Sequence, residues 1–304
     1  MAYTFGPIHS RRFGLSLGID LSPFMKQCNY DCLYCELASA KTLPKQTTSA
    51  SVEEILQEVE KKLNDKVEVV TITANGEPTL YPYLGELVEG LKKIQHNAKT
   101  LILSNSSTLN QPKVFQTLLH VDKVKLSLDA VSQDIFQKID RPYNKMDIRS
   151  IIDAMKQFCK VYKGELYIEV LFVKNINDKP DEIEKINQTL LGFENITRVD
   201  IGTIDRPPAF DVKPLEYDRL YEIAKRFSPL LPLHIVSRKH TEGTIRQSYT
   251  TAEILSTLKK RPLTYEDIEL LFDESARQRL EELVTTKLVE KKSVGGVEFF
   301  VCNS

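Results

Sequence analysis

Short apolar segments alternate with amphipathic segments along the middle of the chain, and this alternation constrains the fold more than any other feature. Seven segments have the composition of buried strands, at residues 14–19, 67–73, 99–104, 121–128, 165–173, 197–203 and 233–237. Helical patterns lie between them near residues 84–95, 111–119, 147–162, 180–191 and 215–228. Repeated strand–helix alternation is typical of a parallel sheet with helices outside it. Periodicity predicts the α/β class but does not distinguish an open sheet from a curved one.

A further helix is predicted after residue 50. Ser51-Val-Glu-Glu54 has the spacing of a capping box, in which a serine side chain satisfies a free backbone N–H at the start of a helix. The apolar residues that follow fall on one face at helical spacing, namely Val52, Ile55, Leu56, Val59 and Leu63.

Three cysteines lie together in a C-x3-C-x2-C pattern at Cys28, Cys32 and Cys35. A [4Fe–4S] cluster has four irons and is held by cysteine thiolates, so three local ligands leave one iron free for a non-protein ligand. Structural zinc takes four ligands, which this segment does not offer, although zinc and plain reduced thiols stay open as alternatives. Of the other cysteines, Cys159 falls on an apolar helical stripe and is predicted to be a core thiol, and Cys302 a structural bystander.

The cysteine spacing, with Tyr34 just before the last cysteine, resembles the cluster loop of the radical S-adenosylmethionine (SAM) superfamily. Further segments are similar to the branch that contains the wyosine-forming tRNA enzymes. They are residues 6–20, Asn75–Thr79, Ser127–Ala130, Asp140–Pro142 and Arg206–Pro208, so the likeness covers residues 1 to about 240.

The resemblance implies a (β/α)6 partial TIM barrel with its cofactor site at the carboxyl ends of the strands. It also implies two cofactors, a [4Fe–4S] cluster and SAM, whose amino and carboxylate groups would bind the fourth iron. In the family, an electron from the reduced cluster breaks a C–S bond of SAM, and the resulting 5′-deoxyadenosyl radical abstracts hydrogen from a substrate. An electron donor such as flavodoxin or ferredoxin is implied as a partner.

Glu77 is the first candidate for binding SAM. The segment Asn75-Gly76-Glu77 resembles a Gly-Gly-Glu segment that holds the amino group of SAM, and it departs from that segment at Asn75. Asparagine tolerates positive φ better than most residues, which would preserve the turn. The alternative is a glutamate that caps an ordinary turn after a strand.

Other candidates lie at the ends of the following strands. Ser104 and Asn105 end one strand, and Ser127 and Asp129 end the next, where they suit the carboxylate and ribose hydroxyls of SAM. Their alternative role is that of strand-end and N-cap residues. Tyr34 is expected near the adenine or, equally, in plain core packing.

Four arginines lie in the segments that carry the resemblance, at Arg11, Arg12, Arg141 and Arg206. Each is a candidate for holding a carboxylate or phosphate of a substrate. Each is equally compatible with a solvated surface or a structural ion pair.

The wyosine-forming reaction itself is not carried over to this chain. Those enzymes use an additional iron–sulfur cluster held by further cysteines, and they join pyruvate to a methylated guanosine in tRNA. The extra cysteines are missing here, and their substrate-binding lysine has no clear counterpart.

The pattern changes near residue 240, which divides the chain into domains 1–245 and 246–304. Three short helical patterns, at residues 250–260, 264–272 and 274–287, precede two strand-like runs joined at Gly295 and Gly296. This order predicts a small winged helix-turn-helix domain. It contains basic residues for phosphate contacts at Lys259, Lys260, Arg261, Arg277, Arg279, Lys287, Lys291 and Lys292.

Charge and hydropathy narrow the class of protein. The formal net charge of −1 argues against a strongly electrostatic binder of nucleic acid. No run of about 18 apolar residues occurs, no signal peptide is evident, and cysteine usage suits a reducing compartment, so a cytoplasmic protein is expected.

Three functions stay open. The first is a radical SAM enzyme that modifies tRNA or another RNA, and the second a radical SAM enzyme that modifies a peptide held by the C-terminal domain. The third is a non-catalytic iron–sulfur sensor that binds nucleic acid. A sensor needs the cysteines but has no use for a SAM pocket, so Glu77, Ser104 and Ser127 favour an enzyme.

Overall fold

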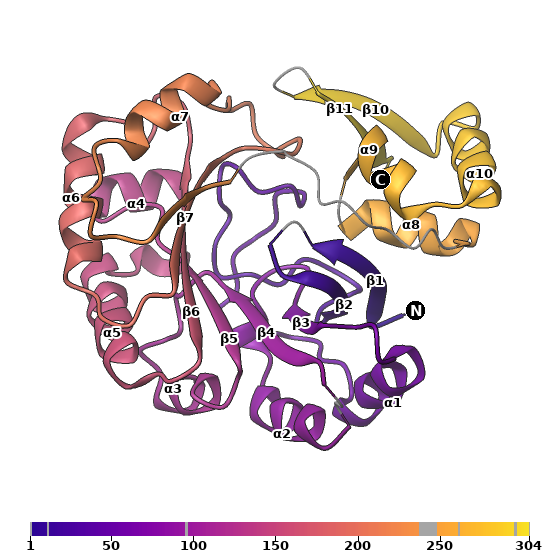
Figure 1. The fold of residues 1–304 in the computed structure, drawn as a ribbon, viewed down its shortest axis with the longest axis horizontal. Coiled ribbons are helices and arrows are strands. Elements are labelled where there is room, and N and C mark those ends of the chain that lie inside the picture. The colour runs from indigo at the N-terminus through magenta and orange to yellow at the C-terminus, as the bar shows by residue number, and fades with distance from the viewer. Residues whose placement is uncertain are drawn as a thin grey trace.

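A computed structural model describes residues 2–10, 12–94, 97–236, 248–260, 262–294 and 297–303 of the chain. Its main feature is an eight-stranded sheet whose strands lie in chain order and curve into a partial barrel (Figure 1). The strands are β1 (Thr4–Ser10), β2 (Gly14–Asp20), β3 (Val69–Thr73), β4 (Lys99–Ser104), β5 (Lys123–Ser127), β6 (Glu165–Phe172), β7 (Arg198–Thr203) and β8 (Leu233–Ile235). Strands β2 to β8 are parallel, and β1 pairs antiparallel with β2.

Helices cover the outer face of the sheet (Figure 1). They are α1 (Val52–Lys62), α2 (Leu84–Ile94), α3 (Pro112–Leu118), α4 (Gln133–Ile139), α5 (Ile148–Val161), α6 (Pro180–Leu191) and α7 (Tyr217–Ala224), with short 3-10 turns at Pro78–Leu80 and Tyr143–Lys145. Ser51 caps α1 as predicted, since its hydroxyl accepts from the N–H of Glu54 at 3.5 Å. Among the described residues, no helix is long and apolar enough to cross a membrane.

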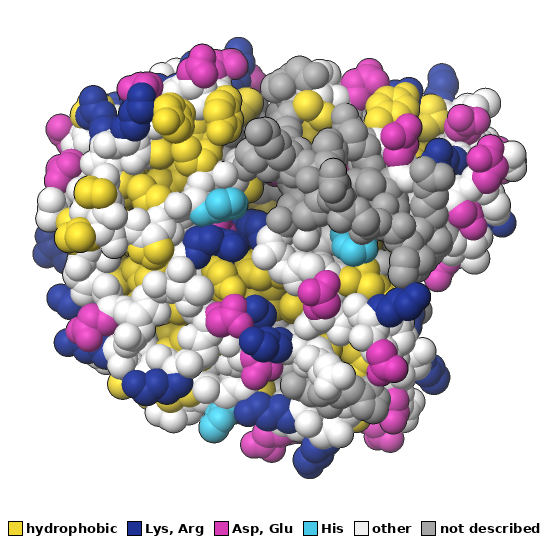
Figure 2. Space-filling view, in the orientation of Figure 1, with side chains coloured by type: hydrophobic (Ala, Val, Ile, Leu, Met, Phe, Trp, Pro, Cys, Tyr) yellow, Lys and Arg dark blue, Asp and Glu magenta, His cyan; other side chains and the backbone are white. Residues whose placement is uncertain are grey.

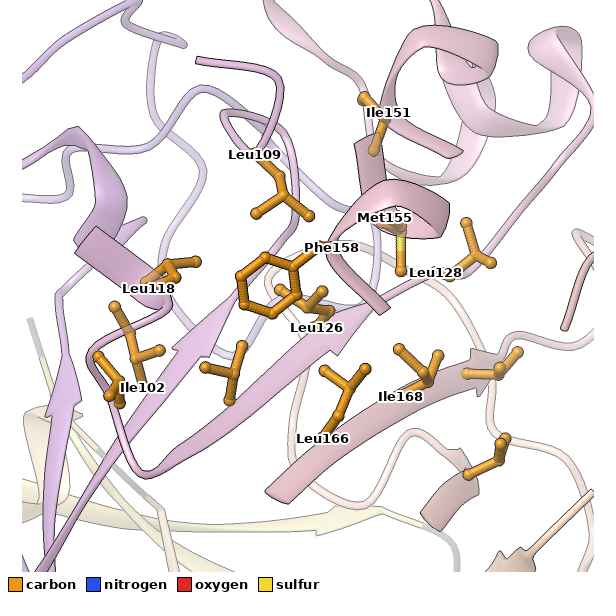
Figure 3. Close-up of a cluster of buried hydrophobic side chains, with 14 of the residues drawn as sticks. Ile102, Leu109, Leu118, Leu126, Leu128, Ile151, Met155, Phe158, Leu166 and Ile168 are labelled. Carbon is orange, nitrogen blue, oxygen red and sulfur yellow. The ribbon is translucent and has the colours of Figure 1, made fainter. Parts of the chain in front are cut away.

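The main core fills the layer between sheet and helices. Figure 3 shows Phe158 and Met155 of α5 facing Leu126 of β5 and Leu166 of β6, and all four are buried. Alternate residues of each parallel strand point into this layer, and the others point into the barrel. Apolar packing thus holds the strands, while the inward residues are left for the site.

The seven predicted strands and the α/β class are confirmed, and the sheet is curved. Strand β1 was not predicted, because Gly6 and Pro7 interrupt its pattern and the pairing with β2 is irregular between Phe5 and Ile8. Helix α4 was also missed, since seven residues form too short an amphipathic pattern to be distinguished from a loop.

The C-terminal part contains α8 (Thr251–Lys260), β9 (Leu263–Thr264), α9 (Tyr265–Leu271), α10 (Glu274–Thr285), β10 (Val289–Val294) and β11 (Val297–Cys302). Its strands form an antiparallel sheet of order β10-β11-β9. It has its own hydrophobic core, which also contains Ile8 of β1, and it lies beside β1 in Figure 1. The predicted boundary at 245/246 and the glycine turn at 295–296 lie outside the described residues.

Candidate functional site

The cysteine-containing loop follows β2 and rests on the turn after β3. The N–H of Gln27 donates to the carbonyl of Asn75 at 2.8 Å, and the N–H of Glu77 donates to the carbonyl of Gln27 at 3.0 Å. Between them, Gly76 has φ of +137°, and a Cβ there would lie 1.9 Å from the carbonyl oxygen of Gln27. Only glycine allows this approach. The expectation that Asn75 itself would take positive φ is not met, because Gly76 makes the turn.

Cys28, Cys32 and Cys35 lie close enough to raise one another's pKa. Burial and the neighbouring Glu77 raise the pKa of Cys28 to about 12, so the bare thiol keeps its proton. Lys26 lies beside these thiols. Burial lowers its pKa, but Cys35 and Asp31 raise it above the ordinary value. Three adjacent thiols with one cation suit the iron corners of an anionic cluster, because iron stabilises the thiolate form and Lys26 offsets part of its charge.

Several contacts fix the loop over the strand ends. The hydroxyl of Tyr34 donates to Asp129 Oδ2 at 2.5 Å, and the N–H of Ala209 donates to the carbonyl of Cys35 at 2.9 Å. Arg206 Nη1 pairs with Glu36 Oε2 at 2.8 Å, directly after the last cysteine. The loop is therefore tied to the turns that follow β5 and β7.

Glu77 is almost fully buried, at 2% exposure, and its carboxylate is used within the protein. Oε1 accepts from Thr79 N, Thr79 Oγ1 and Ser104 Oγ, and Oε2 accepts from the N–H of Asn105 at 2.7 Å. Burial raises the pKa of Glu77, although these donors oppose the rise. Glu77 and Ser104 thus join the turns after β3 and β4, behind the surface that would face SAM.

Asn105, Ser127 and Asp129 border a small recess behind Tyr34. Asn105 Nδ2 donates to Asn29 Oδ1 at 2.9 Å, which places its side chain against the cysteine loop. Asp129 Oδ1 accepts from the N–H of Leu171 at 2.7 Å. Burial raises the pKa of Asp129 to about 6, against the lowering effect of the Tyr34 hydrogen bond.

A cavity of about 480 Å³ opens inside the barrel beside the cysteine loop. Of the candidates for SAM, Tyr34 and Asn75 line it, together with Cys35. The rest of its lining is mixed. The apolar part is formed by Phe5, Ile8, Phe13, Leu101, Leu103, Leu171 and Ile204, and the uncharged polar part by Ser10, Ser16, Thr71 and Thr73. A cavity at the carboxyl ends of parallel strands, with polar groups among apolar side chains, is typical of a ligand site.

The sequence did not single out Lys125 or Glu169, which form a charged group with the candidate Arg12 in this cavity. Lys125 of β5 and Arg12 both donate to Glu169 of β6, and all three line the cavity. Burial would raise the pKa of Glu169, but Lys125 and Arg12 hold it well below its ordinary value. The signal was present, because charged residues at alternate positions of β5, β6 and β7 all point into the barrel.

Asp200 of β7 organises the far side of this group. It is fully buried and accepts two hydrogen bonds from Arg198, at 2.7 and 3.1 Å, and one from Arg12 at 3.3 Å. His234 Nδ1 of β8 lies 3.0 Å from Asp200 Oδ1. In Figure 2, a histidine lies beside basic side chains near the middle of the face in view, next to hydrophobic side chains.

The four candidate arginines have different surroundings. Arg12 and Arg206 line the cavity, each held by a carboxylate. Arg141 lies against the cysteine loop, 3.4 Å from Asp31, and over the ring of Phe210. Arg11 lies outside the described residues.

The family model of the radical SAM superfamily matches residues 22–188, which contain the three cysteines and the turns after β3, β4 and β5. This chain belongs to the radical SAM superfamily. It is also 42% identical to a UPF0026 protein of Helicobacter pylori over 97% of this chain and 96% of that protein.

More distant relatives share parts of the chain. A probable dual-specificity RNA methyltransferase RlmN of Malacoplasma penetrans is 25% identical over 54% of this chain and 49% of that protein. The crystal structure of a radical SAM methyltransferase from Sphaerobacter thermophilus superposes with a TM-score of 0.55 at 14% identity, over 74% of this chain and 67% of that one. The latter likeness supports the fold alone.

Membership of the superfamily makes the protein an enzyme that uses a [4Fe–4S] cluster and SAM, and that needs a reductant. The residues present fit these groups. Cys28, Cys32 and Cys35 would hold three irons, and the cavity that Cys35 lines would take SAM.

Proposed function

We propose that this enzyme cleaves SAM reductively and uses the 5′-deoxyadenosyl radical to abstract hydrogen from a nucleoside of RNA that enters the barrel. The observation that carries the proposal is the cavity that runs from Tyr34, Cys35 and Asn75 down to Lys125 and Glu169. When bound, the cluster supplies the electron that breaks the C–S bond of SAM. The barrel wall supplies position and excludes water.

The residues of the chain have distinct roles in this proposal. The three cysteines hold the cluster, and Tyr34 and Asn75 contact SAM at the cavity wall. Asn105, Ser127 and Asp129 border the recess behind that wall, and the buried Glu77 and Ser104 hold the adjoining strand ends together. A flavodoxin or ferredoxin is the proposed reductant. A sensor without catalysis has no use for such a cavity.

Residues 246–304 form a winged helix domain in this proposal, because α8, α9 and α10 precede the β10–β11 pair. Their charge does not make a strong phosphate-binding surface, since they contain nine Lys and Arg against ten Asp and Glu. Arg277 and Arg279 also donate to backbone carbonyls of this part. Support for an RNA substrate therefore comes from the cavity inside the barrel and from the likeness to an RNA methyltransferase.

One observation favours a peptide substrate as the second candidate. Strand β10 is an edge of the C-terminal sheet and pairs only with β11 among the described strands. An edge strand can accept an extended peptide by strand addition.

RNA from cells that lack this gene provides the test. The anaerobically reconstituted protein is mixed with SAM, reductant and that RNA, and 5′-deoxyadenosine is measured. We expect faster formation than with RNA from unmodified parent cells, in which the target is already modified. Equal rates with both RNAs would contradict an RNA substrate. If, in addition, only the protein fraction of the deletion cells stimulates formation of 5′-deoxyadenosine, the substrate is a peptide.

A further inference from the structure

The charged side chains inside the barrel do not form a basic pocket. The cavity is lined by three formally positive side chains, Arg12, Lys125 and Arg206, and by four formally negative ones, Asp20, Glu36, Glu169 and Asp205. Arg198 and Asp200 pair with each other and add one charge of each sign. A free phosphate or carboxylate gains little from such a set of charges. A neutral ring that both donates and accepts hydrogen bonds fits it better.

Lys125 and Glu169 are the members best placed to read such a ring. They come from adjacent strands, line the same cavity and touch each other, so donor and acceptor face one ligand side by side. The side chain of Lys125 is only 9% exposed and that of Glu169 19%. Buried ion pairs are costly compared with apolar packing, and this pair lines a cavity that it shares with the hydroxyls of Ser16 and Thr71 as well as with apolar side chains. The pair is therefore available to a polar ligand.

An aromatic surface lies beside the pair. Phe13 lines the cavity, and its ring is fixed edge-on against Tyr167 at 5.0 Å. Arg198 lies over both rings, at 5.8 Å from the centre of Phe13 and 4.8 Å from that of Tyr167. Aromatic rings and arginine planes are the surfaces on which unstacked bases of RNA are held.

Guanine matches this arrangement among the four bases of RNA. A carboxylate accepts best from two neighbouring N–H groups, and guanine presents them at N1 and N2. Its O6 and N7 are acceptors for lysine or arginine. Adenine, cytosine and uracil do not present two adjacent N–H donors from different ring positions next to a carbonyl.

We infer that the barrel selects a guanine base, with Glu169 accepting from N1–H and N2–H and Lys125 or Arg12 donating to O6. The inference rests on the proposed function, since it names the nucleoside that the RNA would present. A methyl group on N1 removes one donor, so the site takes unmethylated guanine and refuses N1-methylguanine.

The test measures binding of five-nucleotide RNAs to the reconstituted protein in the presence of SAM. UUGUU should bind at least tenfold more tightly than UUAUU, UUCUU and the N1-methylguanine form of UUGUU. Glu169→Gln and Lys125→Met should each weaken binding of UUGUU about tenfold and leave SAM affinity unchanged.

Matched controls come from the same two strands. Lys123 and Glu165 form another ion pair between these strands, at 2.6 Å, two residues before Lys125 and four before Glu169. Glu165→Gln and Lys123→Met should leave UUGUU binding within about twofold of the parent protein. Equal binding of UUGUU and UUAUU, or equal losses in the control variants, would overturn the inference.

The two proposals fail separately. Formation of 5′-deoxyadenosine without preference for guanine removes the inference and leaves radical SAM chemistry in place. A clear guanine preference without any 5′-deoxyadenosine contradicts the proposed function instead.

Discussion

Gly76 lies directly against Gln27, so that a side chain on Gly76 would overlap the carbonyl oxygen that accepts from Glu77 N. This contact joins the cysteine loop to the turn after β3. The position of the cluster ligands in the barrel therefore depends on the absence of a side chain at residue 76.

Gly76→Ala should displace the cysteine loop, because its Cβ would lie 1.9 Å from Gln27 O and its φ of +137° is unfavourable for alanine. We expect loss of most of the iron measured after anaerobic reconstitution. Gly85→Ala is the matched control, since its Cβ would meet only Thr117 Oγ1 at 3.4 Å and Gly85 lies within α2. It should keep the iron and raise the free energy of unfolding by about 0.5–1 kcal/mol. Full iron content in Gly76→Ala would show that the contact is dispensable.

Glu77→Ala should lower the free energy of unfolding by about 3 kcal/mol, because it leaves buried donors of Thr79, Ser104 and Asn105 without their acceptor. Denaturant unfolding of the protein measures this change. Glu89→Ala, at an exposed position of α2, should change it by less than about 0.5 kcal/mol. An unchanged free energy of unfolding in Glu77→Ala would mean that water or another group satisfies these donors.

The lowered pKa of Glu165 predicts that the stability of the protein depends on pH. Burial raises its pKa, but Lys123, Lys99 and Tyr167 lower it further, to about 2 from the ordinary 4.5. A carboxyl group whose pKa is lower in the folded protein stabilises the fold at any pH above its pKa in the unfolded chain. This contribution is lost as pH falls from about 4.5 to 2. Because the side chain of Glu165 is 34% exposed and therefore partly screened by solvent, Glu165→Gln should cost on the order of 1 kcal/mol at pH 7 and progressively less below pH 4.5.

Unfolding measured at pH 7 and pH 3 in the parent and in Glu165→Gln checks this dependence. Glu194→Gln serves as the control, since its pair with Lys160 is exposed and long, at 3.8 Å. A difference between parent and Glu165→Gln that grows toward pH 3 would reverse the predicted sign.

The position of Ile8 predicts that contacts with β1 hold the C-terminal part against the barrel. Ile8 is 6% exposed and belongs to the core of α8, α9 and α10 although it lies in β1. Ile8→Ala should cost about 2–3 kcal/mol of unfolding free energy, through lost burial and a cavity. Leu230→Ala, at a side chain with 84% exposure, should be neutral. If Ile8→Ala is equally neutral, the contact between β1 and the C-terminal core does not stabilise the protein.

Sequence patterns predicted the parallel strands well because most of them, such as β3 and β4, are short apolar runs with buried residues on both faces. They missed β1, where Gly6 and Pro7 break the alternation, and they could not predict curvature, which depends on side-chain packing across the sheet. In the site, the cysteines were found from spacing alone. Lys125 and Glu169 were missed because each looks like an ordinary strand charge, and only the register of β5 with β6 brings them into one cavity.

The central claim is that three cysteines and a neighbouring cavity make this protein a SAM-cleaving enzyme. Its most direct test is the amount of 5′-deoxyadenosine formed from SAM and a strong reductant by the anaerobically reconstituted protein. We predict formation by the parent protein and by Cys159→Ala, whose thiol is buried in the main core, and none by Cys32→Ala. No 5′-deoxyadenosine from parent protein that carries four irons, or undiminished formation by Cys32→Ala, would contradict the account.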